Sequence, residues 1–226
     1  MNLEAKKSFI ATFPLFSVLS EEEQFQLEKM LDHKVKTKYS FIYLPDTPSD
    51  VIYFLARGTV KIGTHSTDGK EVIKSLIHPM AMFGELGLIG EKSRQDFAQV
   101  LKEDVHVYTL RVTDFKKLMR NNFDLCSSVM SLFGGRLMHA ENKLESLIFK
   151  DARTRIIDFI KDAVNKRGRR VGYEMLLKHS LTHQDIANIT CTSRQTVTLV
   201  LNELKKLDLI YFNRGKILVR DMAKLA

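Results

Sequence analysis

The strongest constraint in this sequence is a line of apolar side chains spaced alternately by three and four residues. It comprises Phe123, Cys126, Met130, Phe133, Leu137, Ala140, Leu144 and Leu147. Such spacing places one narrow apolar seam on a single long helix, which is typical of two helices packed together. A helix packed only on its own domain's core usually has a wider apolar stripe, and this alternative stays open. We expect a dimerisation helix over residues 122–150, with a homodimer interface formed by Met130, Phe133, Leu137, Ala140, Leu144 and Leu147.

The net charge is divided unequally between the part of the chain up to residue 147 and the part that follows it. The formal net charge is +8, from 35 Lys and Arg against 27 Asp and Glu. Residues 1–147 carry 19 basic and 19 acidic side chains, whereas residues 148–226 carry 16 basic and 8 acidic ones. The whole excess therefore lies in the last third of the chain. This predicts a neutral module joined to one that binds a polyanion.

Composition excludes several classes of protein. Hydrophobic residues make up 44% and charged residues 27%, as in ordinary globular proteins. The apolar stretches are too short to span a membrane, and the N-terminal segment lacks the pattern of a signal peptide. Two cysteines, Cys126 and Cys191, are too few for a cysteine-rich zinc site or a four-cysteine iron–sulfur cluster. We expect a soluble cytoplasmic protein with free thiols, no membrane partner and no iron–sulfur cluster.

The first half of the chain predicts a roll of short strands with flanking helices. Ser20 and Glu23 have the spacing of a capping box, so a helix is expected to run from there to about Leu31. β-like runs follow at residues 39–44, 51–55, 59–63, 72–77 and 105–110, and Asp68-Gly69 is a hairpin signal. Many short strands joined by regular turns are typical of an antiparallel barrel or roll. We expect an α+β fold with this domain over residues 1–121.

The last third, residues 151–226, predicts a winged helix-turn-helix. Thr182 begins one short helix, and Ser193 can cap a second that runs to about Leu207. Two short helices joined by a tight turn form a helix-turn-helix, whose second helix enters the DNA major groove. Residues 208–212 and 216–220 then predict two strands around the turn Asn213-Arg214-Gly215, which is a wing. A helical hairpin that packs on another protein domain is the less favoured alternative.

The residue types of this module suit duplex DNA. Arg can donate two hydrogen bonds to guanine and Gln can pair with adenine, while hydroxyl groups can donate to phosphates. The expected DNA contacts are Thr182, Ser193, Arg194, Gln195, Thr196, Thr198, Arg214 and Lys216. A basic run at residues 166–170 precedes them, and we interpret it as a loop that is either solvated or phosphate-facing.

These motifs together resemble the family of cyclic-AMP receptor protein and the fumarate–nitrate reduction regulator, the CRP/FNR family. The resemblance rests on Leu181–Ala187, Thr192–Val197 and Leu201–Leu204, and on Phe83-Gly84-Glu85-Leu86 in the first half. It covers almost the whole chain. It implies a bacterial-type homodimeric transcription regulator with an N-terminal β-roll similar to cyclic nucleotide-binding domains. It also implies RNA polymerase as a partner.

The recognition helix departs from many members of that family. Gln195 stands where many have Glu, and Leu199 stands where many have Arg. Because Glu accepts from cytosine whereas Gln favours adenine, the family's operator sequence does not transfer to this chain. Cys191 replaces a usual glycine, which predicts a slightly strained turn.

The resemblance also implies an effector pocket at Gly84, Glu85, Leu86, Arg94 and Gln95. Backbone N–H groups at a helix start hold anions, and Arg binds phosphate with paired donors. Family members that bind cyclic AMP follow the arginine with a hydroxyl residue and Ala, whereas Gln95 and Asp96 follow it here. The dimer helix also lacks a hydroxyl at residues 139–142. Cyclic AMP is therefore disfavoured, and another small effector or no effector stays open.

Other sensing and catalytic chemistries find less support. His65, His78 and His139 have no spacing that marks a haem or metal site, and His179 and His183 lack an intervening glutamate of a zinc-protease helix. No nucleophile–base pair supports an enzyme acting on a phosphorylated metabolite at Glu85 and Arg94. We expect no enzymatic activity and no metal. The favoured function is a homodimeric, sequence-specific DNA-binding regulator controlled through the roll, with an effector-independent regulator as the alternative.

Overall fold

The structure, a computed structural model, describes residues 3–225. The chain forms two compact units. One contains the residues up to Thr64 together with Lys74–Met138, and the other contains His65–Ile73 together with the residues from His139 onward. Both units combine helices with antiparallel sheet, as the sequence predicts. Within the described residues, none of the helices has the length and apolar character needed to cross a membrane.

The first unit begins with helices that pack on the roll. They are α1 (Leu3–Thr12), the 3₁₀ turn η1 (Pro14–Phe16) and α2 (Glu21–Met30). The predicted capping box of α2 is present, because Glu23 N–H donates to Ser20 Oγ at 3.3 Å and Ser20 N–H donates to Glu23 Oε2 at 2.9 Å. Helix α1 was not predicted from the sequence.

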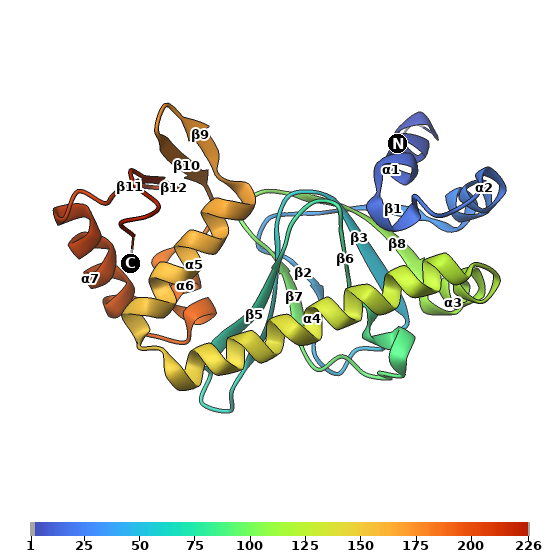
Figure 1. Ribbon diagram of the computed structural model, residues 1–226. Coiled ribbons are helices and arrows are strands. Elements are labelled where there is room, and N and C mark those ends of the chain that lie inside the picture. The colour runs from blue at the N-terminus through green and yellow to red at the C-terminus, as the bar shows by residue number, and fades with distance from the viewer. Residues whose placement is uncertain (1–2, 226) are drawn as a thin grey trace. The chain divides into compact units, whose positions relative to one another are not determined.

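Two four-stranded sheets form the roll, in the orders β1-β8-β3-β6 and β2-β7-β4-β5 (Figure 1). Their strands are β1 (Asp32–Lys36), β2 (Phe41–Tyr43), β3 (Val51–Arg57), β4 (Val60–His65), β5 (Glu71–Ile77), β6 (Ala81–Phe83), β7 (Phe97–Val100) and β8 (Val105–Arg111). The five predicted strands are confirmed, and β1, β6 and β7 are additions. A 3₁₀ turn, η2 (Glu85–Ile89), follows β6, and α3 (Val112–Asn121) follows β8.

An aromatic-rich core joins these helices to the roll. Phe16, Phe54 and Phe115 are fully buried, with ring centroids 5.0 Å apart for Phe16–Phe54 and 6.0 Å for Phe54–Phe115. Leu125 and Val129 of helix α4 (Phe123–Phe149) are buried in the same cluster. These two residues lie outside the apolar seam, and of the seam Phe133 also packs against this cluster, so α4 uses one face for its own core and leaves most of the seam exposed.

The second unit contains the winged helix-turn-helix. Its elements are α5 (Ala152–Arg167), β9 (Arg169–Val171), β10 (Glu174–Lys178), α6 (His183–Thr190), α7 (Arg194–Lys206), β11 (Ile210–Asn213) and β12 (Lys216–Val219). The strand order β11-β12-β10-β9 makes one antiparallel sheet. The interpretation of residues 166–170 as a loop was wrong, because Arg167 ends α5 and Arg169 begins a strand. The residues of β9 form a strand because their backbone pairs with Glu174–Leu176, and composition alone did not predict this pairing.

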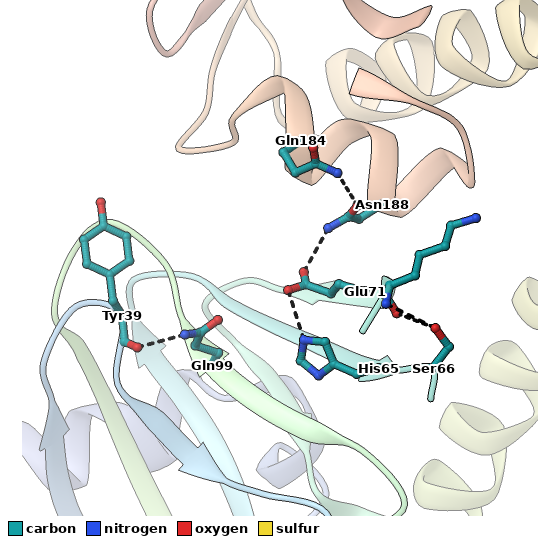
Figure 2. Close-up of polar contacts among 8 residues, drawn as sticks. Tyr39, His65, Ser66, Glu71, Gln99, Gln184 and Asn188 are labelled. Atoms are coloured by element: carbon teal, nitrogen blue, oxygen red, sulfur yellow. Dashed lines mark hydrogen bonds and ion pairs between the residues drawn. The ribbon is translucent and has the colours of Figure 1, made fainter. Parts of the chain in front are cut away.

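The turn between β4 and β5 belongs to this second unit. Asn188 of α6 donates from Nδ2 to Glu71 Oε1 at 3.2 Å, and Glu71 Oε2 lies 3.7 Å from His65 Nε2. Gln184 donates in turn to Asn188 Oδ1 at 2.8 Å, as Figure 2 shows. The exposed side of α6 therefore has polar partners on residues 65–73, which a pattern-based prediction cannot find.

Candidate nucleic-acid interface and effector pocket

Helix α6 is fixed at its start by a reciprocal cap. The backbone N–H of Asp185 donates to Thr182 Oγ1 at 3.1 Å, and the backbone N–H of Thr182 donates to Asp185 Oδ2 at 2.7 Å. Both partners satisfy N–H groups that the helix leaves free. Ile186 and Ala187 are buried beneath the cap. Thr182 therefore lies exposed at the helix start with its hydroxyl oriented by the cap.

The turn after α6 is held by an arginine from α5. Cys191 has φ +51°, the left-handed conformation that glycine adopts most easily, so the expected strain at this turn is present. Arg155 donates from Nε to the carbonyl of Thr190 at 2.9 Å and from Nη2 to that of Cys191 at 3.1 Å. These bonds satisfy carbonyls at the helix end. Nothing in the local sequence pointed to Arg155, because it lies 35 residues before its partners.

Helix α7 has a buried side and an exposed N-terminal side. Val197, Val200, Leu201 and Leu204 pack into the unit, and Ser193 caps the helix by accepting from Thr196 N–H at 3.0 Å. On the other side Arg194, Gln195, Thr198 and Leu199 line an open depression of about 430 Å³. Arg194 and Gln195 are exposed, and Leu199 is 69% exposed. The structure thus brings together three of the predicted DNA contacts and one apolar side chain.

All four predicted hydroxyl contacts are engaged within the protein, and Thr182 donates from Oγ1 to Asp185 Oδ2 at 2.6 Å. Thr198 donates from Oγ1 to the carbonyl of Arg194 at 2.9 Å and also lies 3.0 Å from His183 Nδ1. Thr196 Oγ1 lies 2.8 Å from Ser193 Oγ. Thr198 therefore orients the start of α7 and connects it to α6. His183 was not among the predicted contacts, because this pairing joins residues 15 positions apart on two helices.

The wing presents its basic residues at the exposed turn between β11 and β12. Arg214 and Lys216 are both exposed there, and Gly215 has φ +76°. A Cβ at Gly215 would lie 3.0 Å from the carbonyl of His179, so the turn packs closely on the preceding segment. Arg169 and Arg170 lie on β9, at the opposite edge of the sheet from β11. The basic run and the wing are therefore two separate positive regions.

The predicted effector residues enclose a buried polar cluster in the first unit. Arg94 is 2% exposed; it donates from Nη1 to the carbonyl of Gly84 at 2.8 Å and from Nη2 to that of Val51 at 2.5 Å. Its guanidinium also lies 4.4 Å from the centroid of the Tyr43 ring, a cation–π distance. Gly84 has φ +70°, and a Cβ there would lie 2.9 Å from Arg94 Nη1. Arg94 is thus bonded to the backbone of its own domain.

Glu85 is paired with an arginine of the long helix. It is 1% exposed, and Arg136 of α4 donates from Nη1 to its Oε1 and from Nη2 to the carbonyl of Met82. Burial raises the pKa of Glu85 above its usual value, and the Arg136 charge acts in the opposite direction. Two buried atoms of the cluster, Glu85 Oε2 and Arg94 Nε, have no hydrogen-bond partner within residues 3–225. Arg136 is the functional candidate that the sequence pattern missed.

The other predicted pocket residues lie differently. Leu86 is partly exposed on η2, and Gln95 is exposed, donating to the carbonyl of Ser93 at 3.2 Å. Asp96 is buried and pairs with Lys74 at 3.3 Å, and its charge adds to burial in raising the pKa of Tyr43. The charge of Asp96 acts on Glu85 as well, and this second carboxylate makes the pocket less positive than one built for a phosphate.

The apolar seam of α4 is largely exposed. Met130, Leu137, Leu144 and Leu147 are exposed, with Leu137 at 62%, and Ala140 is also exposed. Phe133 is half-buried and packs against the core cluster. Met138, Ile148 and Phe149 widen the exposed apolar surface. An exposed apolar surface of this kind is typical of interaction sites.

Comparisons with known proteins agree with this architecture. A family model described as a cyclic nucleotide-binding domain matches residues 35–122, and one described as a Crp-like helix-turn-helix domain matches residues 154–226. A CRP-like cAMP-activated global transcriptional regulator of Mycobacterium tuberculosis is 25% identical over 185 residues, 82% of each chain. The global nitrogen regulator of a Nostoc species is 25% identical over 186 residues, covering 82% of this chain and 83% of its own.

Solved structures show the same fold. A mutant of CooA from Carboxydothermus hydrogenoformans has a TM-score of 0.79 with 24% identity, and the match covers 93% of each chain. Of the two named relatives, one is called a cAMP-activated transcriptional regulator and the other a nitrogen regulator.

Proposed function

The chain belongs to the CRP/FNR family of transcription regulators, and from this premise we propose that it acts as a homodimer that binds a specific DNA operator. The observation that carries the proposal is the N-terminal side of α7, where Arg194 and Gln195 are exposed beside an open depression. Both side chains have the donors and acceptors that read base edges. Ser193, Thr182, Arg214 and Lys216 surround them with groups suited to phosphates.

Helix α4 is proposed to form the dimer interface. Its exposed seam has the three-and-four spacing of a two-helix interface, and its buried side is already used by Leu125 and Val129. In this proposal residues 1–121 form the sensor domain, 122–150 the dimerisation helix and 151–226 the DNA-binding domain. Two recognition helices related by a two-fold axis would read two half-sites about 10 bp apart.

The sensor domain supports two forms of control. The partnerless Glu85 Oε2 and Arg94 Nε favour a small polar effector that satisfies them and disrupts the Glu85–Arg136 pair. The bonds from Arg94 to two backbone carbonyls, and from Arg136 to Glu85, favour effector-independent binding instead. In the first case the effector must bind the DNA-competent state more tightly than the other state. We favour an effector other than cyclic AMP, since the charge of Asp96 acts on Glu85 and adds a second carboxylate to this cluster.

The DNA-binding proposal is tested by mobility shift on fragments of promoter DNA at several salt concentrations. We expect binding that weakens steeply with salt, because phosphate contacts release counterions. Arg194→Ala should reduce discrimination between fragments, while Arg214→Ala should weaken binding to all of them about equally. Absent binding, or binding that does not depend on salt, would contradict the proposal. An unchanged sequence preference in Arg194→Ala would contradict its base-reading role.

Calorimetric titration separates the two forms of control. The wild-type dimer is titrated with cyclic AMP, cyclic GMP and a panel of small anionic metabolites. The same titrations are made with Arg136→Gln, which removes the positive charge that faces Glu85. Heat of binding that is coupled to a change in DNA affinity supports an effector, whereas DNA affinity unaffected by every compound supports the alternative. The proposal places the protein in the cytoplasm, with RNA polymerase as the partner through which bound dimers act on transcription.

A further inference from the structure

His183 occupies the junction of the three elements that form the proposed DNA-binding face. It is the first residue of α6, its Nδ1 lies 3.0 Å from Thr198 Oγ1 of α7, and its ring centroid lies 5.9 Å from that of Phe212 on β11. It is half-buried and adjacent in sequence to Thr182, an exposed residue whose hydroxyl caps α6. No expectation from the sequence gave this residue a role at the interface.

The hydrogen bonds around Thr198 determine which tautomer His183 adopts. A threonine hydroxyl has one proton, and Thr198 donates it to the carbonyl of Arg194 at 2.9 Å. In its bond with His183 the hydroxyl must therefore accept, so His183 Nδ1 carries a proton and donates. In the neutral ring Nε2 is then the unprotonated nitrogen. Within residues 3–225 Nε2 has no hydrogen-bond partner, which leaves it available to a group outside the protein.

The charged groups around His183 come from each element packed against it. Partial burial of the ring and, after it, the charge of Arg194 on α7 lower the pKa of His183, so the free protein holds the ring neutral near pH 7. Lys205 of α7 lies 5.6 Å from the centroid of the Phe212 ring, on the β11 side. On α6 itself the Asp185 carboxylate is bonded to Thr182, and His179 accepts from Leu181 N–H at 3.2 Å. Of these groups, Arg194 is the one whose charge acts on the ring, and that charge is positive.

We propose that His183 is a DNA-backbone contact that takes up a proton when duplex binds, its Nε2 then donating to a phosphate while Nδ1 continues to hold Thr198. The inference rests on the proposed DNA-binding function. The phosphate supplies the negative charge that the free site lacks, so it favours the imidazolium form. Because Nδ1–H is bonded in both states, the ring changes its charge without moving α6 away from α7. His183 is in this sense both a contact and a positioning residue.

The sign of the pH effect follows from linkage. Protonated His183 is favoured in the complex and disfavoured in the free protein, so between the two pKa values binding of DNA takes up a proton. Affinity for DNA therefore falls as the pH rises through that window. Each unit by which the phosphate raises the pKa of His183 corresponds to as much as tenfold in affinity per protomer.

The test measures binding of a 30-bp duplex of random sequence by fluorescence anisotropy from pH 6 to pH 8 at constant ionic strength. A random duplex suffices because phosphate contacts carry no sequence information. The variant is His183→Gln, whose amide can still donate to Thr198 but cannot be protonated. His139→Gln, a change of the same kind at an exposed position of α4, is the matched control.

We expect wild type and His139→Gln to bind about tenfold more tightly at pH 6 than at pH 8. His183→Gln should lose most of this dependence while keeping its affinity at pH 8 within about twofold. Equal pH dependence in wild type and His183→Gln would overturn the inference and leave the proposed function intact. Failure of wild type to bind duplex at any pH would overturn both.

An NMR titration of the wild-type protein gives a second measurement, which does not depend on the variant folding. The Cε1 proton of His183 reports its protonation with and without duplex. A pKa that is higher in the complex supports the proposal, and an equal or lower one overturns it.

Discussion

Replacing Arg94 distinguishes a structural arginine from a ligand-binding one. Arg94 is 2% exposed and donates to the carbonyls of Gly84 and Val51, which lie on two different segments of the roll. A side chain reserved for a ligand would contribute little to stability when replaced. One that satisfies buried carbonyls would be needed for folding. We therefore predict that Arg94→Met destabilises the first unit even though methionine is similar in length and apolar.

The magnitude follows from the contacts. Methionine removes both donors, and each buried carbonyl left without a partner costs about 1–3 kcal/mol. The cation–π contact with Tyr43 adds about 1–2 kcal/mol at a desolvated site. Part of this loss is offset because the variant no longer buries a guanidinium charge, which costs several kcal/mol. The expected net loss is about 2–5 kcal/mol, or on the order of 10 °C in the melting temperature.

Urea denaturation followed by circular dichroism measures this loss, with Arg120→Met as the control. Arg120 is exposed in the last turn of α3, so its replacement should cost less than about 1 kcal/mol. If Arg94→Met were as stable as the control, the arginine would not be structural. The assignment of its guanidinium to backbone carbonyls would then be refuted.

Three further substitutions test separate parts of the molecule. Leu137→Glu should convert the dimer to monomers in sedimentation velocity, because it places a charge on the 62%-exposed centre of the seam, whereas Glu141→Gln should not; a dimeric Leu137→Glu protein would refute the seam. Cys191→Gly should stabilise the second unit by about 0.5–1 kcal/mol in urea denaturation, since φ +51° strains a side chain; a loss of stability would show that the thiol contributes packing. Thr182→Val should cost about 1 kcal/mol by removing the cap of α6, and an unchanged stability would contradict the role of that hydroxyl.

Local patterns predicted the DNA-binding module well because its determinants are close in sequence. The caps at Thr182 and Ser193 lie three residues from the N–H groups that they satisfy, and the wing turn at Gly215 needs a positive φ. The buried face of α7 follows directly from helical periodicity. Such features are visible in a window of a few residues, so the fold class and the helix bounds followed.

The contacts that the sequence did not predict join residues far apart in the chain. Arg136 lies 51 residues from Glu85, and His183 lies 15 residues from Thr198 on a different helix. Arg94 donates to backbone carbonyls, and because every residue type has one, the sequence does not indicate these bonds. The strand at Arg169 depends on pairing with β10 rather than on its own strongly basic composition. Tertiary pairing decided each of these outcomes.

Selecting bound fragments from a random duplex library and sequencing them shows whether a dimer reads DNA with two α7 helices. We expect an inverted repeat whose half-sites have centres about 10 bp apart, since a two-fold dimer contacts successive major grooves on one side of the duplex. The same selection with Arg194→Ala should give a weaker and less defined repeat. Enrichment of a single half-site without symmetry, or no enrichment, would contradict this proposal.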